Sequence, residues 1–200
     1  EQTASAGDAY AQYFLALTHL DYASPQRDTD VAEAWLQAAS RKSIPDAQYR
    51  LALLLKDKDT RASLQHLADA AQQKHGAANA VLGEYYHVGL YVNQDLVRAI
   101  AHYETAVDQG IAVATNNLAW LLATASAPTI DPNRAIELIQ PLAIYTGNWQ
   151  YLDTLAAAHA RLKHFRLAES IQNEAIRLSQ RAEESGALVA DLQARLALYQ

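Results

Sequence analysis

Apolar and small residues repeat along this chain at a spacing much longer than one helical turn. A leucine followed directly by alanine or glycine recurs at intervals of 36, 31, 36 and 37 residues. These pairs are Leu15-Ala16, Leu51-Ala52, Leu82-Gly83, Leu118-Ala119 and Leu155-Ala156. Self-similarity at this period is typical of stacked supersecondary units, so the sequence predicts a repeat architecture.

Each repeat predicts two helices that pack as a hairpin. Alanine precedes the leucine by four positions in the first four repeats, and further alanines recur on the segment that follows. Small residues at these contact positions let paired helices approach closely. First helices are predicted near 8–20, 46–56, 77–87, 112–123 and 149–162. Second helices are predicted near 29–42, 60–74, 95–109, 132–144 and 165–181, separated by Gly, Pro and Asn residues.

We predict one helical-repeat domain over residues 1–200, because stacked units share a continuous core and need no domain boundary. Its units are 8–42, 46–74, 77–109, 112–144 and 149–181. A final helix over 186–199 carries an apolar stripe on one face, formed by Leu188, Leu192, Leu196 and Tyr199. We interpret this helix as a cap on the exposed end of the stack, and the alternative is a helix that binds a partner.

Composition and charge exclude several classes of function. Half of the residues are hydrophobic and Gly and Pro are few, which favours helices. The formal net charge is −6 and Arg41-Lys42 is the only adjacent basic pair. Nucleic-acid binding needs clustered Lys and Arg, so we do not expect it. The apolar run 51–55 ends at Lys56, and no run approaches the length of a membrane span.

Cysteine and methionine are both absent from the sequence. Disulfides and thiolate metal sites are therefore excluded. The missing Met indicates a fragment or a processed form, and both an exported protein without its signal and an internal fragment fit. The absence of Cys is compatible with the periplasm and with the cytoplasm.

Residues 78–110 carry the most specific motif. Small, aromatic and glycine positions agree at fixed offsets, in the order Ala78, Leu82, Gly83, Tyr86, Gly89, Val92, Asp95, Ala99, Tyr103, Ala106 and Gly110. This segment resembles the Sel-1-like repeat, a relative of the tetratricopeptide repeat (TPR). Residues 116–178 resemble instead the last two units of many bacterial TPR proteins. The resemblance implies a right-handed α-solenoid of about five helix-turn-helix repeats with a C-terminal capping helix.

One position departs from the Sel-1-like pattern. The family usually has a second glycine two residues after Gly89, where this chain has Tyr91. An unchanged loop would force this bulky residue towards positive φ. We expect the loop to differ slightly and Tyr91 to be exposed.

Members of this family bind other proteins, often in bacterial envelopes, so the resemblance implies a non-catalytic scaffold or adaptor. The partner would be a protein or peptide held in the concave groove, and we favour a periplasmic or envelope location, with the cytoplasm as the alternative. The first helices should line that groove with Tyr13, Tyr49, Glu84, His87, Asn116, Trp120, Asp153 and Arg161. For Tyr13, Leu17, Tyr49 and Leu53 a role in the core is equally open.

Catalytic and metal chemistry lack a sequence pattern. The seven histidines form no His-x-x-x-His pair, so we expect no metal site and no cofactor. Glu84 and His87 share a helix face, but a shallow groove seldom supplies the dry pocket that acid–base catalysis requires. We therefore do not expect an enzyme.

Two alternatives to the adaptor stay open. The first is a self-assembling module of an envelope complex that uses the apolar stripe of the last helix, and the sequence leaves the oligomeric state undetermined. The second is a polysaccharide-handling protein, which would need exposed Tyr49, Tyr91 or Trp120 rings.

Overall fold

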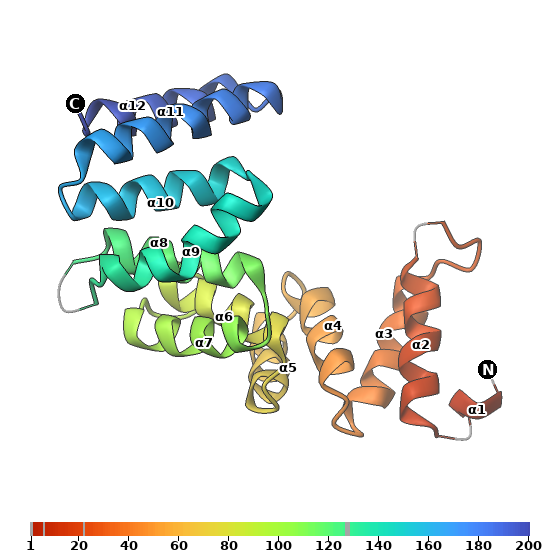
Figure 1. Ribbon diagram of the computed structural model, residues 1–200. Coiled ribbons are helices and arrows are strands. Elements are labelled where there is room, and N and C mark those ends of the chain that lie inside the picture. The colour runs from red at the N-terminus through yellow and green to blue at the C-terminus, as the bar shows by residue number, and fades with distance from the viewer. Residues whose placement is uncertain (1, 6, 22, 127–128) are drawn as a thin grey trace. The chain divides into compact units, whose positions relative to one another are not determined.

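The computed structural model describes residues 2–5, 7–21, 23–126 and 129–200, and these residues form helices without any strand (Figure 1). The helices are α1 (Gln2–Ser5), α2 (Ala9–Leu20), α3 (Thr29–Ser40), α4 (Pro45–Leu55), α5 (Thr60–Gln72), α6 (Gly76–Val88), α7 (Leu96–Asp108), α8 (Ala112–Thr124), α9 (Pro132–Thr146), α10 (Trp149–Arg161), α11 (Phe165–Arg181) and α12 (Gly186–Ala197). Helices α2 to α12 match the predicted helices to within two residues at each end. The all-helical repeat fold is therefore confirmed, and α1 is an addition that the sequence did not predict.

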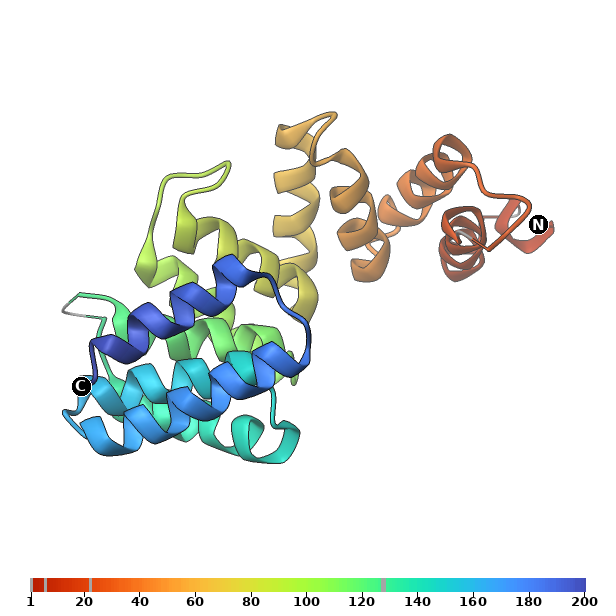
Figure 2. The same ribbon diagram turned by 90° about the horizontal axis from the view of Figure 1, so that it is seen from above.

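The chain divides into two compact units, Glu1–Gln109 and Gly110–Gln200. The first unit holds the three hairpins α2–α3, α4–α5 and α6–α7. Successive hairpins also contact each other, through α3 with α4 and through α5 with α6. Figure 2 shows the paired helices of these hairpins from above. The second unit holds the hairpins α8–α9 and α10–α11 and the last helix α12.

An aspartate begins the second helix of each of the first four hairpins. The carboxylates of Asp28, Asp59, Asp95 and Asp131 accept hydrogen bonds from backbone N–H groups in the first turn. These N–H groups have no partner inside the helix, so an N-cap carboxylate stabilises the helix start. The recurring aspartates explain why the second helices begin where the repeat pattern places them.

The core of each hairpin is a large side chain on the second helix, flanked by small residues. The large residue is fully buried in all five hairpins: Leu36, Leu67, Tyr103, Ile139 and Gln172. In the third hairpin Tyr103 packs directly against Gly83. A Cβ atom at Gly83 would lie 2.6 Å from Cδ1 of the Tyr103 ring, so only glycine fits there. The third repeat therefore has Leu-Gly where the other four have Leu-Ala.

Helix α12 packs on α11 and uses its apolar stripe within the chain. Leu192 is fully buried and Tyr199 is 9% exposed, while Leu188 and Leu196 are half-buried. The stripe that motivated the self-assembly alternative therefore faces the chain's own hairpin. The interpretation of α12 as a capping helix is confirmed.

Candidate protein-binding surfaces

Three predicted site residues come together in the second unit. Asn116 and Trp120 on α8 and Asp153 on α10 line one hollow of about 240 Å³. Its wall also contains Arg195, which comes from α12. The repeat frame therefore brings these three positions to one surface, and the capping helix adds a cation that sequence reasoning did not place there.

Asp153 is bound within the chain. Its side chain is 10% exposed, and Oδ1 accepts hydrogen bonds from Gln172 Nε2 at 2.8 Å and from Arg195 Nε at 2.9 Å. Burial of a carboxylate requires such charge-assisted partners, because an unpaired buried charge is costly. Asp153 thus joins α10, α11 and α12. Both partners follow it in the sequence by 19 residues or more, so no local pattern could reveal this role.

Asn116 and Trp120 retain surface for a ligand. The Asn116 carbonyl oxygen accepts a hydrogen bond from Thr154 Oγ1 at 2.8 Å, while its amide N–H groups have no partner among the described residues. The Trp120 ring is half-buried and lies 5.6 Å from the Arg195 guanidinium, in a cation–π contact. One side of this surface therefore offers hydrogen-bond donors and the other a large ring.

A second hollow of about 400 Å³ adjoins the first, because Trp120 lines both. Arg161, another predicted site residue, is exposed on its rim beside Phe165 and Tyr199. Burial, with the Asp153 carboxylate nearby, raises the pKa of Tyr199 to about 12. Tyr199 therefore stays neutral at physiological pH, and the hollow combines apolar walls with the Arg161 cation.

The predicted tyrosines of the first unit are half-buried. Tyr13 packs against the core formed by α2, α3 and α4, and Tyr49 packs against the core of α4, α5 and α6. The Tyr49 ring centroid also lies 4.9 Å from the His75 ring. Leu17 and Leu53 are half-buried as well. These residues contribute to the core and still present some surface, so both predicted roles remain compatible with their positions.

Glu84 and His87 share a face of α6 but form no enclosed acid–base site. Glu84 is exposed, and His87 Nδ1 lies 3.4 Å from the Tyr103 hydroxyl. Burial lowers the pKa of His87, opposed by the nearby Glu84 carboxylate. In the described part of the chain, no group of three or more His, Asp or Glu side chains could hold a metal ion.

A further groove, which the sequence did not predict, lies between α5 and α7. It has a volume of about 760 Å³, and we call it the aromatic groove. Its lining includes Arg61, Leu64, Ala68, Tyr86, Tyr91 and His102. The Tyr86 and His102 rings are stacked, with centroids 5.6 Å apart and an interplanar angle of 3°. The signal in the sequence was the departure at Tyr91 from the glycine of the Sel-1-like pattern.

Tyr91 adopts φ of 62°, so the expectation of a changed loop was wrong at this residue. The expected exposure is correct, at 43%. The edge-to-face contact of its ring with Tyr85, with centroids 5.1 Å apart, offsets part of the cost of the left-handed backbone. Tyr91 thereby adds a wall to the aromatic groove. Its exposure also keeps the polysaccharide alternative open. The other two rings that this alternative could use, those of Tyr49 and Trp120, are half-buried, and Trp120 belongs to the other unit.

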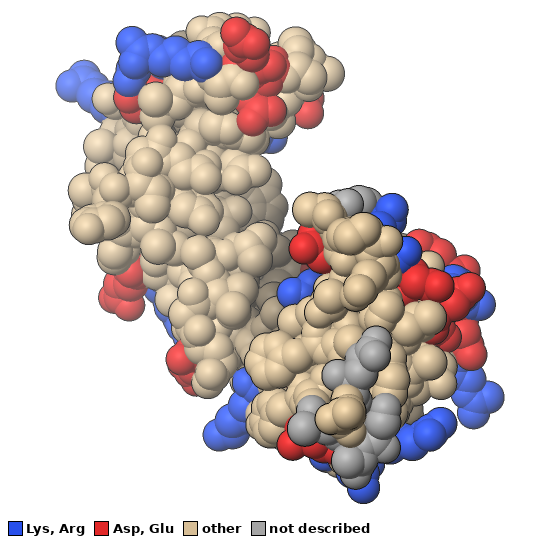
Figure 3. Space-filling view, turned by 90° about the vertical axis from the view of Figure 1, so that its right-hand side faces the viewer, with Lys and Arg blue, Asp and Glu red and all other residues tan. Residues whose placement is uncertain are grey.

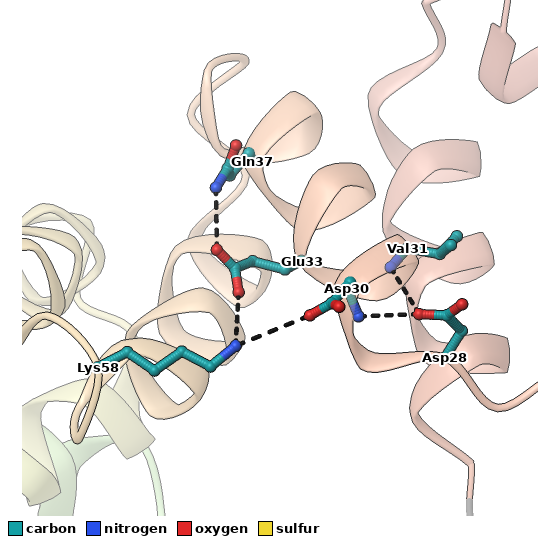
Figure 4. Close-up of polar contacts among 6 residues, drawn as sticks. All are labelled: Asp28, Asp30, Val31, Glu33, Gln37 and Lys58. Carbon is teal, nitrogen blue, oxygen red and sulfur yellow. Dashed lines mark hydrogen bonds and ion pairs between the residues drawn. The ribbon is translucent and has the colours of Figure 1, made fainter.

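The same position one repeat earlier holds a charged groove of about 870 Å³ between α3, α4 and α5, which we call the acidic groove. Its lining includes Asp30, Glu33, Gln37, Lys58, Asp59 and Asp69. Figure 4 shows Lys58 reaching towards two carboxylates of α3. Lys58 Nζ lies 3.2 Å from Glu33 Oε2 and 3.9 Å from Asp30 Oδ1, and Gln37 Nε2 donates to Glu33 Oε1. The Lys58 cation therefore already pairs with carboxylates of the same groove.

A family model for the Sel1 repeat matches residues 9–43, 45–75 and 76–111, which together make up just over half of the chain. The chain belongs to the Sel1 repeat family. The three matched Sel1 repeats coincide with the hairpins α2–α3, α4–α5 and α6–α7 of the first unit. The predicted resemblance to the Sel-1-like repeat is confirmed, and the likeness of residues 116–178 to TPR units stays a prediction.

Two solved structures share this Sel1 fold. A crystal structure of a Sel1 repeat protein from Oxalobacter formigenes has a TM-score of 0.72 and 19% identity, over 86% of this chain and 74% of that one. A protective antigen present in uropathogenic Escherichia coli strains, displaying an SLR fold, has a TM-score of 0.71 and 19% identity, over 97% of this chain and 46% of that one. This chain thus spans about half the length of that antigen. Curated proteins give no match.

The charged surface and the helix lengths bear on two further predictions. On the face drawn in Figure 3, Lys and Arg side chains lie in separate groups interrupted by Asp and Glu and by uncharged residues. That nucleic acid is not a ligand stays a prediction. Every helix among the described residues is too short or too polar to cross a lipid bilayer.

Proposed function

We propose that this chain is a non-catalytic scaffold that binds a segment of a partner protein on the α8–α10 surface of its second unit. The Sel1 repeat fold is generally a protein–protein interaction scaffold, which supports the coarse assignment. The observation that carries the specific surface is Trp120, a half-buried ring that lines two adjoining hollows.

Trp120 has the properties of an interface anchor. Tryptophan dominates binding energy where a large ring is partly desolvated and surrounded by polar groups. The amide N–H groups of Asn116, which have no partner among the described residues, lie in the wall of the same hollow, and Arg161 lies on the rim of the other. A partner segment that packs an apolar side chain on the Trp120 ring can accept hydrogen bonds from Asn116 through its backbone carbonyls.

The partner has to leave the Asp153 network in place. Asp153 Oδ1 already accepts hydrogen bonds from Gln172 and Arg195, and the Arg195 cation balances the charge of the carboxylate. The surface therefore selects by shape and by hydrogen-bond donors more than by negative charge.

Affinity capture from an extract of the native organism, read by mass spectrometry, tests this function. The chain would be compared with the Trp120→Ala/Asn116→Ala double variant. Tyr145→Ala is the matched control, because Tyr145 is a 93% exposed aromatic residue of the same unit outside both hollows. We expect partners that the chain and the control retain and the double variant loses. Identical partners with all three proteins would refute the proposed surface.

We further propose that the scaffold works in the bacterial envelope. The support for this location is that the two structural relatives come from bacteria. Fractionation of the native organism, followed by immunodetection, tests the location. Recovery of the protein only in the cytoplasmic fraction would refute it.

A further inference from the structure

The aromatic groove of the first unit lies outside the surface proposed above and has its own chemistry. We propose that it binds an apolar peptide segment that carries an acidic residue next to its apolar anchor. The partner site on α8 and α10 belongs to the other unit, so this inference stands independently of it.

The groove suits an apolar side chain. Leu64 and Ala68 of α5 are half-buried in its floor, and Leu82 and Val92 contribute further apolar surface. The volume of about 760 Å³ falls within the range of ligand pockets. Sites of this kind gain binding energy mainly by removing apolar surface from water.

His102 adds an aromatic wall without adding a charge. Its Nδ1 lies 2.9 Å from Asn79 Oδ1, so Nδ1 carries a hydrogen and donates to that oxygen. Burial lowers the pKa of His102, and the Arg98 cation lowers it further. The imidazole is therefore neutral at physiological pH.

The acidic requirement comes from Arg61. This side chain is exposed on the groove and has no ion-pair partner among the described residues, and the lining contains no Asp or Glu. In the acidic groove, one repeat earlier, the residue equivalent to Arg61 is Asp30. Glu33, one turn further along α3, forms an ion pair with Lys58. The aromatic groove therefore has the opposite charge preference and lacks an internal counter-charge.

A peptide fits this groove better than a second copy of the chain. The chain carries a formal net charge of −6, which opposes association of identical copies. A short segment can place one carboxylate at Arg61 and one apolar side chain between α5 and the Tyr91 loop without bringing a second acidic surface close.

A phage-displayed library of random dodecapeptides, selected on the chain, tests the proposal. We expect enrichment of peptides with Leu, Ile or Phe next to Asp or Glu. The enriched peptide, made synthetically, should lose about tenfold or more in affinity with Ala68→Glu and with Arg61→Glu. Gln37→Glu is the matched control, because Gln37 lies at the position of Ala68 in the acidic groove, and it should leave the affinity unchanged.

A charge exchange makes the test specific. With Arg61→Glu, a peptide in which Lys replaces the acidic residue should bind more tightly than the selected peptide. Arg61 is exposed, so this variant keeps its fold, and circular dichroism checks the helix content of all three variants. Three results would overturn the proposal. The first is that the peptides are enriched equally on the chain and on the Ala68→Glu variant, and the second is that the selected peptide binds Arg61→Glu as tightly as the original chain. The third is self-association in sedimentation that Ala68→Glu abolishes.

Discussion

The acidic groove and the aromatic groove occupy the same place in successive repeats of the first unit. In the acidic groove Lys58 forms ion pairs with Glu33 and Asp30, and the turn between α4 and α5 is short. In the aromatic groove the connection from α6 to α7 is longer and brings Tyr91 to the wall. The histidines His66 and His102 lie at equivalent positions in the two grooves.

This comparison shows how a repeat frame separates fold from recognition. The buried small and large residues fix the spacing of the helices. The half-buried groove positions between them can change from carboxylate to apolar, as from Glu33 to Leu64, so each groove can select a different ligand. One repeat has also changed its buried pair, from Ala52 and Leu67 to Gly83 and Tyr103.

Gly83→Ala should give the largest effect on stability. The new Cβ would lie 2.6 Å from a ring carbon of fully buried Tyr103, and overpacking of this kind costs about 3 kcal/mol. Urea unfolding followed by circular dichroism measures the loss. The double variant Gly83→Ala/Tyr103→Leu imitates the second hairpin and should recover most of the stability. Equal stability of Gly83→Ala and the original chain would show that the Gly83–Tyr103 contact is not restrictive.

Asp153→Ala tests the last hairpin, where the equivalent large position is polar Gln172. The substitution removes the carboxylate that pairs with Arg195 and one of the two acceptors of Gln172 Nε2, which keeps its hydrogen bond to the Leu192 carbonyl, so we expect a loss of about 2 kcal/mol. Hydrogen exchange should show the amides of α12 opening more readily than those of α10. Unchanged protection of α12 would mean that its apolar stripe alone holds the cap.

Acidification should destabilise the chain by a smaller amount. The pKa values of His87, His102 and His159 are lowered in the folded state, mainly by burial. The unfolded chain therefore binds more protons just below the ordinary histidine pKa, and the free energy of unfolding falls as pH decreases through about 6.5. Urea unfolding at a series of pH values measures this slope. His102→Gln should reduce it, and an unchanged slope would contradict the assignment to His102.

Lys58→Ala should have the smallest effect. The Lys58 side chain is 59% exposed and that of Asp30 is 90% exposed, and solvent screens ion pairs of this kind. We expect a loss of about 0.5 kcal/mol or less in urea unfolding. A loss above about 1 kcal/mol would show that these ion pairs, and not only the buried residues, hold the acidic groove in shape. Lys58→Arg is the control, since it retains the charge.

The helices were predictable from the sequence because local features set them. The Leu-small pairs marked the first helices, and Asp28, Asp59, Asp95 and Asp131 begin the second helices where the repeat pattern expected them. The aromatic groove was not predictable, because its lining combines residues from α5, α6 and α7 and the loop before α7. Tyr91 departs from the glycine of the repeat pattern, but that departure alone does not reveal its φ of 62° or the contact of its ring with Tyr85.

By itself, the sequence determined the class of fold, the repeat frame and the capping helix, since periodicity and caps act over a few helical turns. The repeat frame also predicted that Asn116 and Asp153 lie on the same surface as Trp120. Only the tertiary structure decided which of those residues are already used. Asp153 meets Arg195 from 42 positions away, and Arg61 faces a groove whose described lining holds no Asp or Glu. Such pairings depend on how whole helices pack, and no local pattern of residues encodes that distance.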